Sequence, residues 1–208
     1  QKGLSAEPEV FLDPNTISKE GIAALGSVSF SKSSKYCAYT INRAGSDWSE
    51  AFVMETDSKK VLSDNLKWLK FSSLSWIGDE GFVYSRYPEP DEKTKLSGQN
   101  QFHMVYFHKI GTPQTEDVLL YRDEANPLRY HFAYATEDQR FLILGISNGT
   151  SGVEIRALDL TKGMKSGFKT ILKGFDNEAN VLDNDGDLLL VQPNKSAANY
   201  KVVAIPFS

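Results

Sequence analysis

Residues 132–146 read FAYATEDQRFLILGI, and this stretch decides the fold. A short apolar strand pattern at 132–135 is followed by a polar turn at 136–140 and then by an apolar run at 141–146. A run of that length bounded by turn residues is typical of a buried strand. The same order of strand, turn and strand occurs at residues 28–41, 74–86 and 180–191. The chain therefore contains four copies of one unit.

The distance between the copies indicates the architecture. The second strands of the four copies begin at Tyr36, Phe82, Phe141 and Leu188, which gives spacings of 46, 59 and 47 residues. These spacings are close to the length of one four-stranded propeller blade. The longer second spacing comes from residues 87–101, a Pro-rich, charged and polar stretch that we expect to be a surface loop.

Further apolar segments complete each unit. Third strands are expected at 51–54, 104–107, 153–158 and 201–205, and shorter fourth strands at 61–62, 118–120 and 170–172. The sequence therefore predicts an all-β fold, a partial β-propeller of about four blades of four-stranded antiparallel sheet. We expect one domain over residues 1–208, with blades at roughly 26–64, 66–122, 128–174 and 178–208.

The two ends of the chain suggest a segment of a longer array. Residues 10–13 have the pattern of a fourth strand with no preceding three, so we expect residues 1–25 to be a lead-in strand and a short connection. One short turn of helix is expected within residues 18–25, weakened by Gly21 and Gly26. The first and last blades are expected to be incomplete, and the apolar face of each terminal blade to be uncovered, which favours self-association.

Composition excludes several classes of function. The formal net charge is −4, and no basic cluster occurs, which argues against a nucleic-acid partner. Apolar runs are of strand length, far short of the roughly 20 residues that cross a bilayer, so no membrane role is expected. The one cysteine, Cys37, lies in a strand pattern and is interpreted as a packed, inert thiol.

No catalytic constellation is found along the chain. The nearest approach to a Gly-x-Ser-x-Gly nucleophile elbow is the stretch 149–152, but Val153 stands in place of the second glycine, so a loop between two strands is expected. His103, His108 and His131 lack the spacing of a helical metal pair, and His108 is expected to pack or to bond the next turn. We therefore predict no catalytic, cofactor-binding or metal-binding residue, and no cofactor.

Three other patterns have structural interpretations. Residues 183–187 place oxygen ligands at alternate positions like a calcium loop, but a tight hairpin with Gly186 at positive φ is preferred. Residues 148–150 and 194–196 satisfy the glycosylation triplet, which matters only for a protein secreted through a eukaryotic pathway. Aromatic residues are abundant, and we expect them to fill the interfaces between blades, including the three tryptophans, Trp48, Trp68 and Trp76.

Several stretches together resemble the propeller domain of the prolyl oligopeptidase family of serine peptidases. Residues 9–15 look like the family's lead into its first blade, and residues 30–39 with the Gly-Ser-Asp-Trp turn at 45–48 are similar to that blade. Residues 76–88 and 100–119 resemble the second blade, with a strand, a histidine, a Gly-Thr turn and an acidic spacer in order. The resemblance covers nearly the whole chain and is weaker after residue 130.

The resemblance implies a role that the residues alone do not. In this family a seven-bladed propeller caps an α/β-hydrolase domain, which is absent from this chain, and excludes large folded proteins from the active site. The chain is thus expected to be a noncatalytic gate of a peptidase that cleaves short peptides after proline, such peptides being partners of the missing domain. A family aromatic that touches substrate aligns with Asp123, so no substrate-binding residue is carried over.

Two alternatives stay open at this point. A propeller-type scaffold without peptidase activity is the competing function, because propellers serve many roles. The expected location is cytoplasmic, or periplasmic if a bacterial parent carries a signal peptide that is removed.

Overall fold

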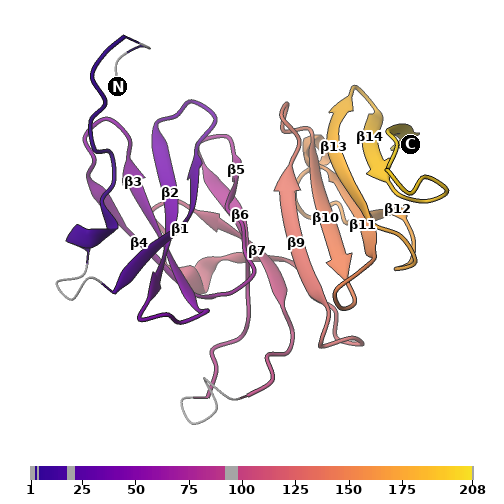
Figure 1. Ribbon diagram of the computed structural model, residues 1–208, viewed down its shortest axis with the longest axis horizontal. Coiled ribbons are helices and arrows are strands. Elements are labelled where there is room, and N and C mark those ends of the chain that lie inside the picture. Colours follow the sequence, from indigo (N-terminus) through magenta and orange to yellow (C-terminus); the bar gives the residue numbers. More distant parts are fainter. Residues whose placement is uncertain (1–2, 4, 18–21, 92–97, 208) are drawn as a thin grey trace.

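The computed structural model describes residues 3, 5–17, 22–91 and 98–207, and these form an all-β arc (Figure 1). Three sheets follow one another along the chain. The first has the order β1-β2-β3-β4-β6-β7-β8 with β5 paired to β6, the second β12-β11-β10-β9 and the third β13-β14-β15. All strand pairs are antiparallel. The predicted partial propeller is confirmed.

The strands group into four blades. Blade 1 comprises β1 (Ala23–Phe30), β2 (Tyr36–Arg43), β3 (Ser49–Glu55) and β4 (Val61–Leu69). Blade 2 comprises β5 (Ser75–Ile77), β6 (Gly81–Arg86), β7 (Met104–Lys109) and β8 (Val118–Tyr121). Blade 3 comprises β9 (Tyr130–Ala135), β10 (Phe141–Ser147), β11 (Val153–Asp159) and β12 (Lys169–Leu172). Blade 4 comprises β13 (Ala179–Asp185), β14 (Leu188–Pro193) and β15 (Val203–Pro206).

Short 3-10 turns are the only helical elements among the described residues. They are η1 (Pro14–Thr16), η2 (Gln114–Glu116) and η3 (Leu160–Lys162). In this part of the chain no helix is long and apolar enough to cross a bilayer.

The interfaces between blades hold the core. In each second strand successive side chains point to opposite faces, so one strand supplies two interfaces. In β10, Phe141 and Ile143 pack toward blade 4, while Leu142 and Leu144 pack toward blade 2. This explains why the central strands are continuously apolar and do not alternate with polar residues.

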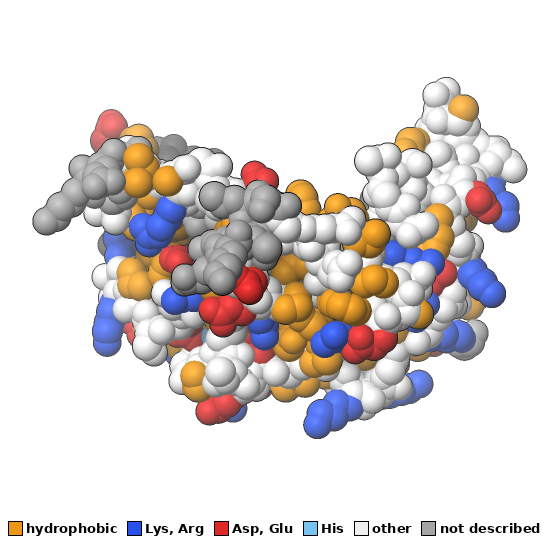
Figure 2. Space-filling view, turned by 90° about the horizontal axis from the view of Figure 1, so that it is seen from below, with side chains coloured by type: hydrophobic (Ala, Val, Ile, Leu, Met, Phe, Trp, Pro, Cys, Tyr) orange, Lys and Arg blue, Asp and Glu red, His pale blue; other side chains and the backbone are white. Residues whose placement is uncertain are grey.

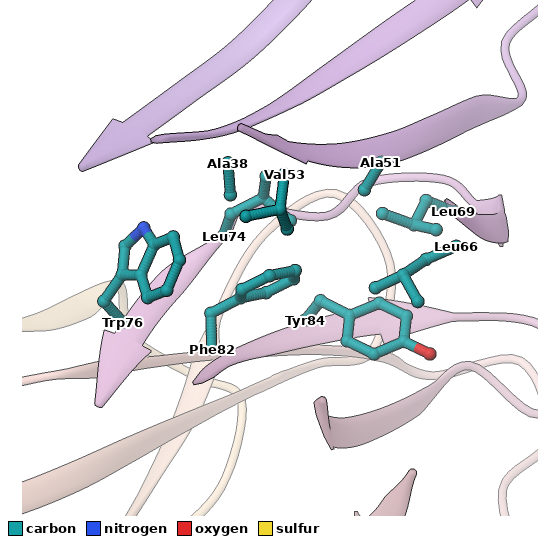
Figure 3. Packing of buried hydrophobic residues seen from close by; sticks show 9 residues of the cluster. All are labelled: Ala38, Ala51, Val53, Leu66, Leu69, Leu74, Trp76, Phe82 and Tyr84. Carbon is teal, nitrogen blue, oxygen red and sulfur yellow. The ribbon is translucent and has the colours of Figure 1, made fainter. Parts of the chain in front are cut away.

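The interface between blades 1 and 2 shows the packing most clearly. Figure 3 shows Phe82 and Tyr84 of β6 lying against Ala38 and Val53 of blade 1. Trp76 of β5 closes one end of this cluster and is 4% exposed. Its indole N–H donates to the backbone oxygen of Ser29 at 3.0 Å, which also satisfies its polar group. The expectation that Trp76 fills a blade interface is confirmed.

The N-terminal segment differs from the prediction. Residues 10–13 form no strand; Phe11 and Leu12 instead pack against the outer face of blade 1, where Cys37 and Tyr39 are buried. Residues 18–21 of the predicted helical turn lie outside the described residues, and the prediction for Ala23–Leu25 is wrong, because these residues begin β1. Their pairing with Ile41–Arg43 overrides the local helix preference.

Blade 1 is also more complete than the sequence indicates. Its fourth strand runs over nine residues, Val61–Leu69, and not over two, so β1 to β4 give the blade four strands. The loop predicted between β6 and β7 is present in its described parts, residues 87–91 and 98–103. Residues 92–97 lie outside the described part.

Candidate functional site

The candidate functional surface is the hollow side of the arc. The space-filling view shows a broad concavity between the two ends of the molecule (Figure 2). The first strands of blades 1, 2 and 3 contribute a pocket of about 290 Å³, lined by residues 29–32, 74–76, 135–137 and 139. We call this the turn-end pocket, because it lies where the first strand of each blade turns into the second.

Hydrogen bonds of the same kind join neighbouring blades beside the turn-end pocket. The amide of Ser33 donates to the Asp79 carboxylate at 3.0 Å, and 104 residues later in the chain the amide of Glu137 donates to the Asp183 carboxylate, also at 3.0 Å. Between these two links, the amide of Gly78 donates to the Gln139 side chain at 2.7 Å. At three successive blade junctions, therefore, a side chain of one blade accepts from a backbone amide in the turn of the preceding blade. These links fix the spacing of the blades around the hollow.

A second pocket of about 430 Å³ lies at the opposite end of blades 1 and 2. Its lining is mostly polar and includes Thr40, Asn42, Asp47 and Lys70, together with Phe71. Phe71 is 62% exposed and has φ +53°, a conformation that bulky residues rarely adopt and that often marks functional sites. The pocket therefore offers hydrogen-bonding groups together with one exposed aromatic residue.

A buried ionic cluster connects the outer strand of blade 1 with blade 2. The His108 ring nitrogens lie 2.9 Å from an Asp64 oxygen and 2.7 Å from an Asp117 oxygen, and all three side chains are at most 1% exposed. Both partners are acceptors, so His108 donates from both nitrogens and is an imidazolium. The amide of Gly111 donates to Asp64 at 2.6 Å, and the Tyr84 hydroxyl donates to Asp117 at 2.6 Å.

The electrostatics of this cluster follow from its geometry. Burial alone would lower the pKa of His108, but the hydrogen bonds and charges of Asp117 and Asp64 outweigh it and raise the pKa to about 9. Burial would raise the pKa of Asp64, but the hydrogen bonds from His108 and from the Gly111 amide bring it below its usual value. Both ring nitrogens of His108 are thus occupied by carboxylates, and the imidazole links Asp64 of blade 1 with Asp117 of blade 2.

The other two histidines form a neutral pair between blades 2 and 3. His103 Nδ1 accepts from the backbone amide of His131 at 3.0 Å, so its Nε2 donates to the Lys70 carbonyl at 2.9 Å. His131 Nδ1 in turn donates to the carbonyl of His103. Burial lowers the pKa of His103 to about 4 and also lowers the pKa of His131. Both rings are therefore neutral and buried between blades 2 and 3.

The two stretches that partly resemble a nucleophile elbow and a calcium loop, residues 149–152 and 183–187, lie in connections between strands and at a hairpin turn. Residues 149–152 connect β10 with β11, as expected, and among the described residues no serine hydroxyl is bonded to a histidine ring. Asp185 pairs with Leu188, which confirms the tight hairpin, and Gly186 has φ +56°. In the part of the chain that the structure describes, no group of three acidic, histidine or cysteine side chains is arranged to hold a metal ion. Cys37 is fully buried, and burial raises its pKa to about 11.

Asp123 organises its own loop. Its carboxylate accepts from the amides of Ala125 and Asn126 at 3.1 Å each, from the Asn126 side chain, and from Arg129 at 3.1 Å. An aspartate held in this way shapes the connection between β8 and β9. Its side-chain bonds account for an acidic residue at this position.

Sequence reasoning missed the partners of His108. Asp64 and Asp117 are 44 residues before and 9 residues after it, so no local motif joins the three. One signal was present: in β4 the buried positions alternate, and Asp64 stands between Leu62 and Leu66 on the inward face. A carboxylate on the buried side of a strand requires a partner.

Comparison with known proteins agrees with this architecture. A family model described as the prolyl oligopeptidase N-terminal beta-propeller domain matches residues 1–208. A prolyl endopeptidase of Elizabethkingia meningoseptica is 44% identical over 203 residues, which are 98% of this chain and 28% of the relative. Prolyl oligopeptidase A of Amanita bisporigera is 35% identical, covering 95% of this chain and 29% of the relative. The chain spans less than a third of the length of these relatives.

Solved structures show the same similarity in three dimensions. Prolyl oligopeptidase B from Galerina marginata, bound to a 35mer hydrolysis and macrocyclization substrate, superposes with a TM-score of 0.86 at 31% identity. The match covers 94% of this chain and 29% of the other. A structure from a study of inter-domain dynamics in two prolyl endopeptidases gives a TM-score of 0.88 at 29% identity, over 99% of this chain and 29% of that one.

Proposed function

Because this chain belongs to the prolyl oligopeptidase N-terminal β-propeller family, we propose that it is the noncatalytic propeller segment of a longer serine endopeptidase. The parent enzyme would cleave short peptides after proline. This segment would form part of the wall that limits access to a catalytic domain encoded elsewhere in that protein.

One observation carries the proposal. The family match extends over the whole of this chain, whereas the chain aligns with only 28% of a 44% identical prolyl endopeptidase. The relative therefore has a large further part that this chain does not match. Within the described residues, the three histidines are buried in structural bonds and none is bonded to a serine hydroxyl.

The geometry supports a role as a wall. The blades are joined by large apolar interfaces and by the repeated turn-to-turn hydrogen bonds beside the hollow. Such packing holds the blades at fixed spacing, because close-packed interfaces resist deformation. A fixed hollow passes a thin, extended chain and excludes a folded domain. We infer that the gating selects by size and not by sequence.

Two measurements test the proposal. The purified chain, incubated with a proline-containing chromogenic peptide, should release product only at the background rate, and the same assay on the parent protein should show turnover. Turnover by this chain alone would overturn the noncatalytic assignment. The reading frame beyond residue 208 should also encode a Gly-x-Ser-x-Gly elbow followed by Asp and His. Further blades without such an elbow would favour a binding scaffold.

A further inference from the structure

A third pocket, of about 380 Å³, lies between blades 3 and 4. Val153 and Ala179 stand at the starts of β11 and β13, and Leu172 and Pro193 at the ends of β12 and β14, so the pocket opens at the end of the blades where these strands meet their loops. We call it the lysine pocket. Its volume is within the range that small-molecule sites occupy, about 300–1,000 Å³.

The floor of the lysine pocket is apolar. Ala179 belongs to the buried cluster between blades 3 and 4, and Val153, Ile171, Leu172 and Val203 pack against that cluster. The pocket is thus an opening into the core between these blades. An apolar group that enters it would leave water at a gain of about 25 cal/mol for each Å² that it buries.

All the charged side chains that line the lysine pocket are positive, and its neutral polar lining residues are Asn177 and Ser196. Lys173, Lys195 and Lys201 line it and are exposed, and none of them forms an ion pair with another described residue. Asp176 and Glu178 stand on a bordering loop but do not line the pocket, and Glu178 accepts from the amide of Gly152 at 2.8 Å. In a chain of net charge −4, this is a local concentration of unpaired positive charge.

The loops that carry these lysines are tied to each other. The amide of Asn194 donates to the Glu178 carbonyl at 3.0 Å, and the Glu178 amide donates to the Asn194 side chain at 2.9 Å. The amide of Lys201 donates to the carbonyl of Pro193 at 3.2 Å. The rim is therefore formed before any ligand arrives, which reduces the entropy lost on binding.

We propose that the lysine pocket binds a carboxylate carried on a short apolar body. The apolar part would lie on the floor, and the carboxylate would face the lysines at the rim. The carboxyl-terminal residue of an apolar peptide has this chemistry, as does a short free fatty acid. Only the peptide form rests on the proposed function, since cleavage after proline leaves peptides that end in a proline carboxylate.

The proposal can be tested by titrating the chain under NMR observation of its backbone amides. The probes are hexanoate and N-acetyl-Ala-Ala-Pro, each compared with its neutral amide. Both acids should shift the amides of Ser196 and Val203 and should bind at least about tenfold more tightly than their amides. Lys195→Gln and Lys201→Gln should each weaken binding about twofold to fivefold, the factor that corresponds to an exposed ion pair of about 0.5–1 kcal/mol.

A matched control is an exposed lysine at the other end of blade 3. Lys165 lies in the connection between β11 and β12, away from the pocket. The variant Lys165→Gln should therefore leave binding unchanged. If N-acetyl-Ala-Ala-Pro binds more tightly than hexanoate, the ligand is a peptide terminus. If hexanoate binds more tightly than the peptide, the ligand is a free acid. Either result supports the site. Equal binding of acids and amides, or an equal loss in Lys165→Gln, would overturn it. No hydrolysis is measured, so the result is independent of the peptidase assay.

Discussion

The buried imidazolium of His108 makes a sharp prediction about stability and pH. The pKa of His108 is raised from its ordinary value of 6.5 to about 9 in the folded chain. A group whose pKa is raised by folding contributes its full stabilisation at pH values below its pKa in the unfolded chain. This contribution is lost as the pH rises through its pKa in the folded chain. A shift of this size corresponds to about 3 kcal/mol. The free energy of unfolding should therefore fall by about 3 kcal/mol between pH 6.5 and pH 9.5.

Two variants show whether His108, and not another titrating group, causes this pH dependence of stability. Asp117→Asn removes one of the two charges that hold the proton, so the loss of stability should move to lower pH. His108→Gln leaves two buried carboxylates without their cation, and breaking such a pair costs roughly 3–5 kcal/mol. It should also abolish the decline above pH 6.5. Asp57→Asn, an exposed position, is the matched control and should reproduce the profile of the unchanged chain.

The assay is urea unfolding followed by tryptophan fluorescence at pH values from 6 to 9.5, with the free energy extrapolated linearly. Long-range ¹⁵N NMR of the His108 ring gives a readout that does not depend on the variants folding. At pH 7.5 both ring nitrogens should carry protons. A neutral ring at that pH, or an unfolding free energy that stays constant from pH 6.5 to 9.5, would refute the reasoning.

Three further predictions follow from burial, steric contact and exposed faces. Burial lowers the pKa of His103 to about 4 and holds its ring neutral. The free energy of unfolding should therefore rise by about 3 kcal/mol as the pH increases from 4 to 6.5. His103→Asn should flatten this rise in the same urea assay. A Cβ on Gly145 would lie 2.1 Å from the ring of Phe132, so Gly145→Ala should cost about 1–3 kcal/mol in urea unfolding, and adding Phe132→Leu should restore most of it. Val202 and Leu182 of blade 4 are 57% and 50% exposed. Light scattering at high concentration should therefore show self-association of the chain, and the double variant Leu182→Lys with Val202→Lys should reduce this self-association. A monodisperse monomer of the unchanged chain would contradict the prediction.

Much of the fold could be predicted because its signals are local. The apolar run Phe141–Ile146 is buried on both faces, and the Gly186 hairpin needs only a residue that accepts positive φ. The lead-in segment could not be predicted in this way. A short apolar pattern at residues 10–13 fits a strand, but it fits equally an irregular segment whose Phe11 ring packs 5.6 Å from that of Phe30.

The candidate site was less accessible to sequence reasoning because its contacts are non-local. The turn-end links join residues one blade apart, such as Ser33 with Asp79, and no short motif marks them. Asp64 and His108 likewise meet only once β4 and β7 are in place. The lysine pocket is similar, because Lys173 and Lys201 come from connections of two different blades. Pairs of this kind depend on the blade spacing, which the repeat indicates only approximately.

The size limit on substrates tests the central claim most directly. The measurement is kcat/KM of the parent enzyme for one Ala-Pro cleavage site placed in peptides of increasing length and in a loop of a folded protein. We expect kcat/KM to fall steeply as the peptide becomes longer, and the folded protein not to be cleaved. Asp79→Ala with Asp183→Ala removes two of the turn-end links and should make the fall less steep. Cleavage of the folded protein at the rate of the short peptide, with the links intact, would contradict the claim that this propeller segment is a gate.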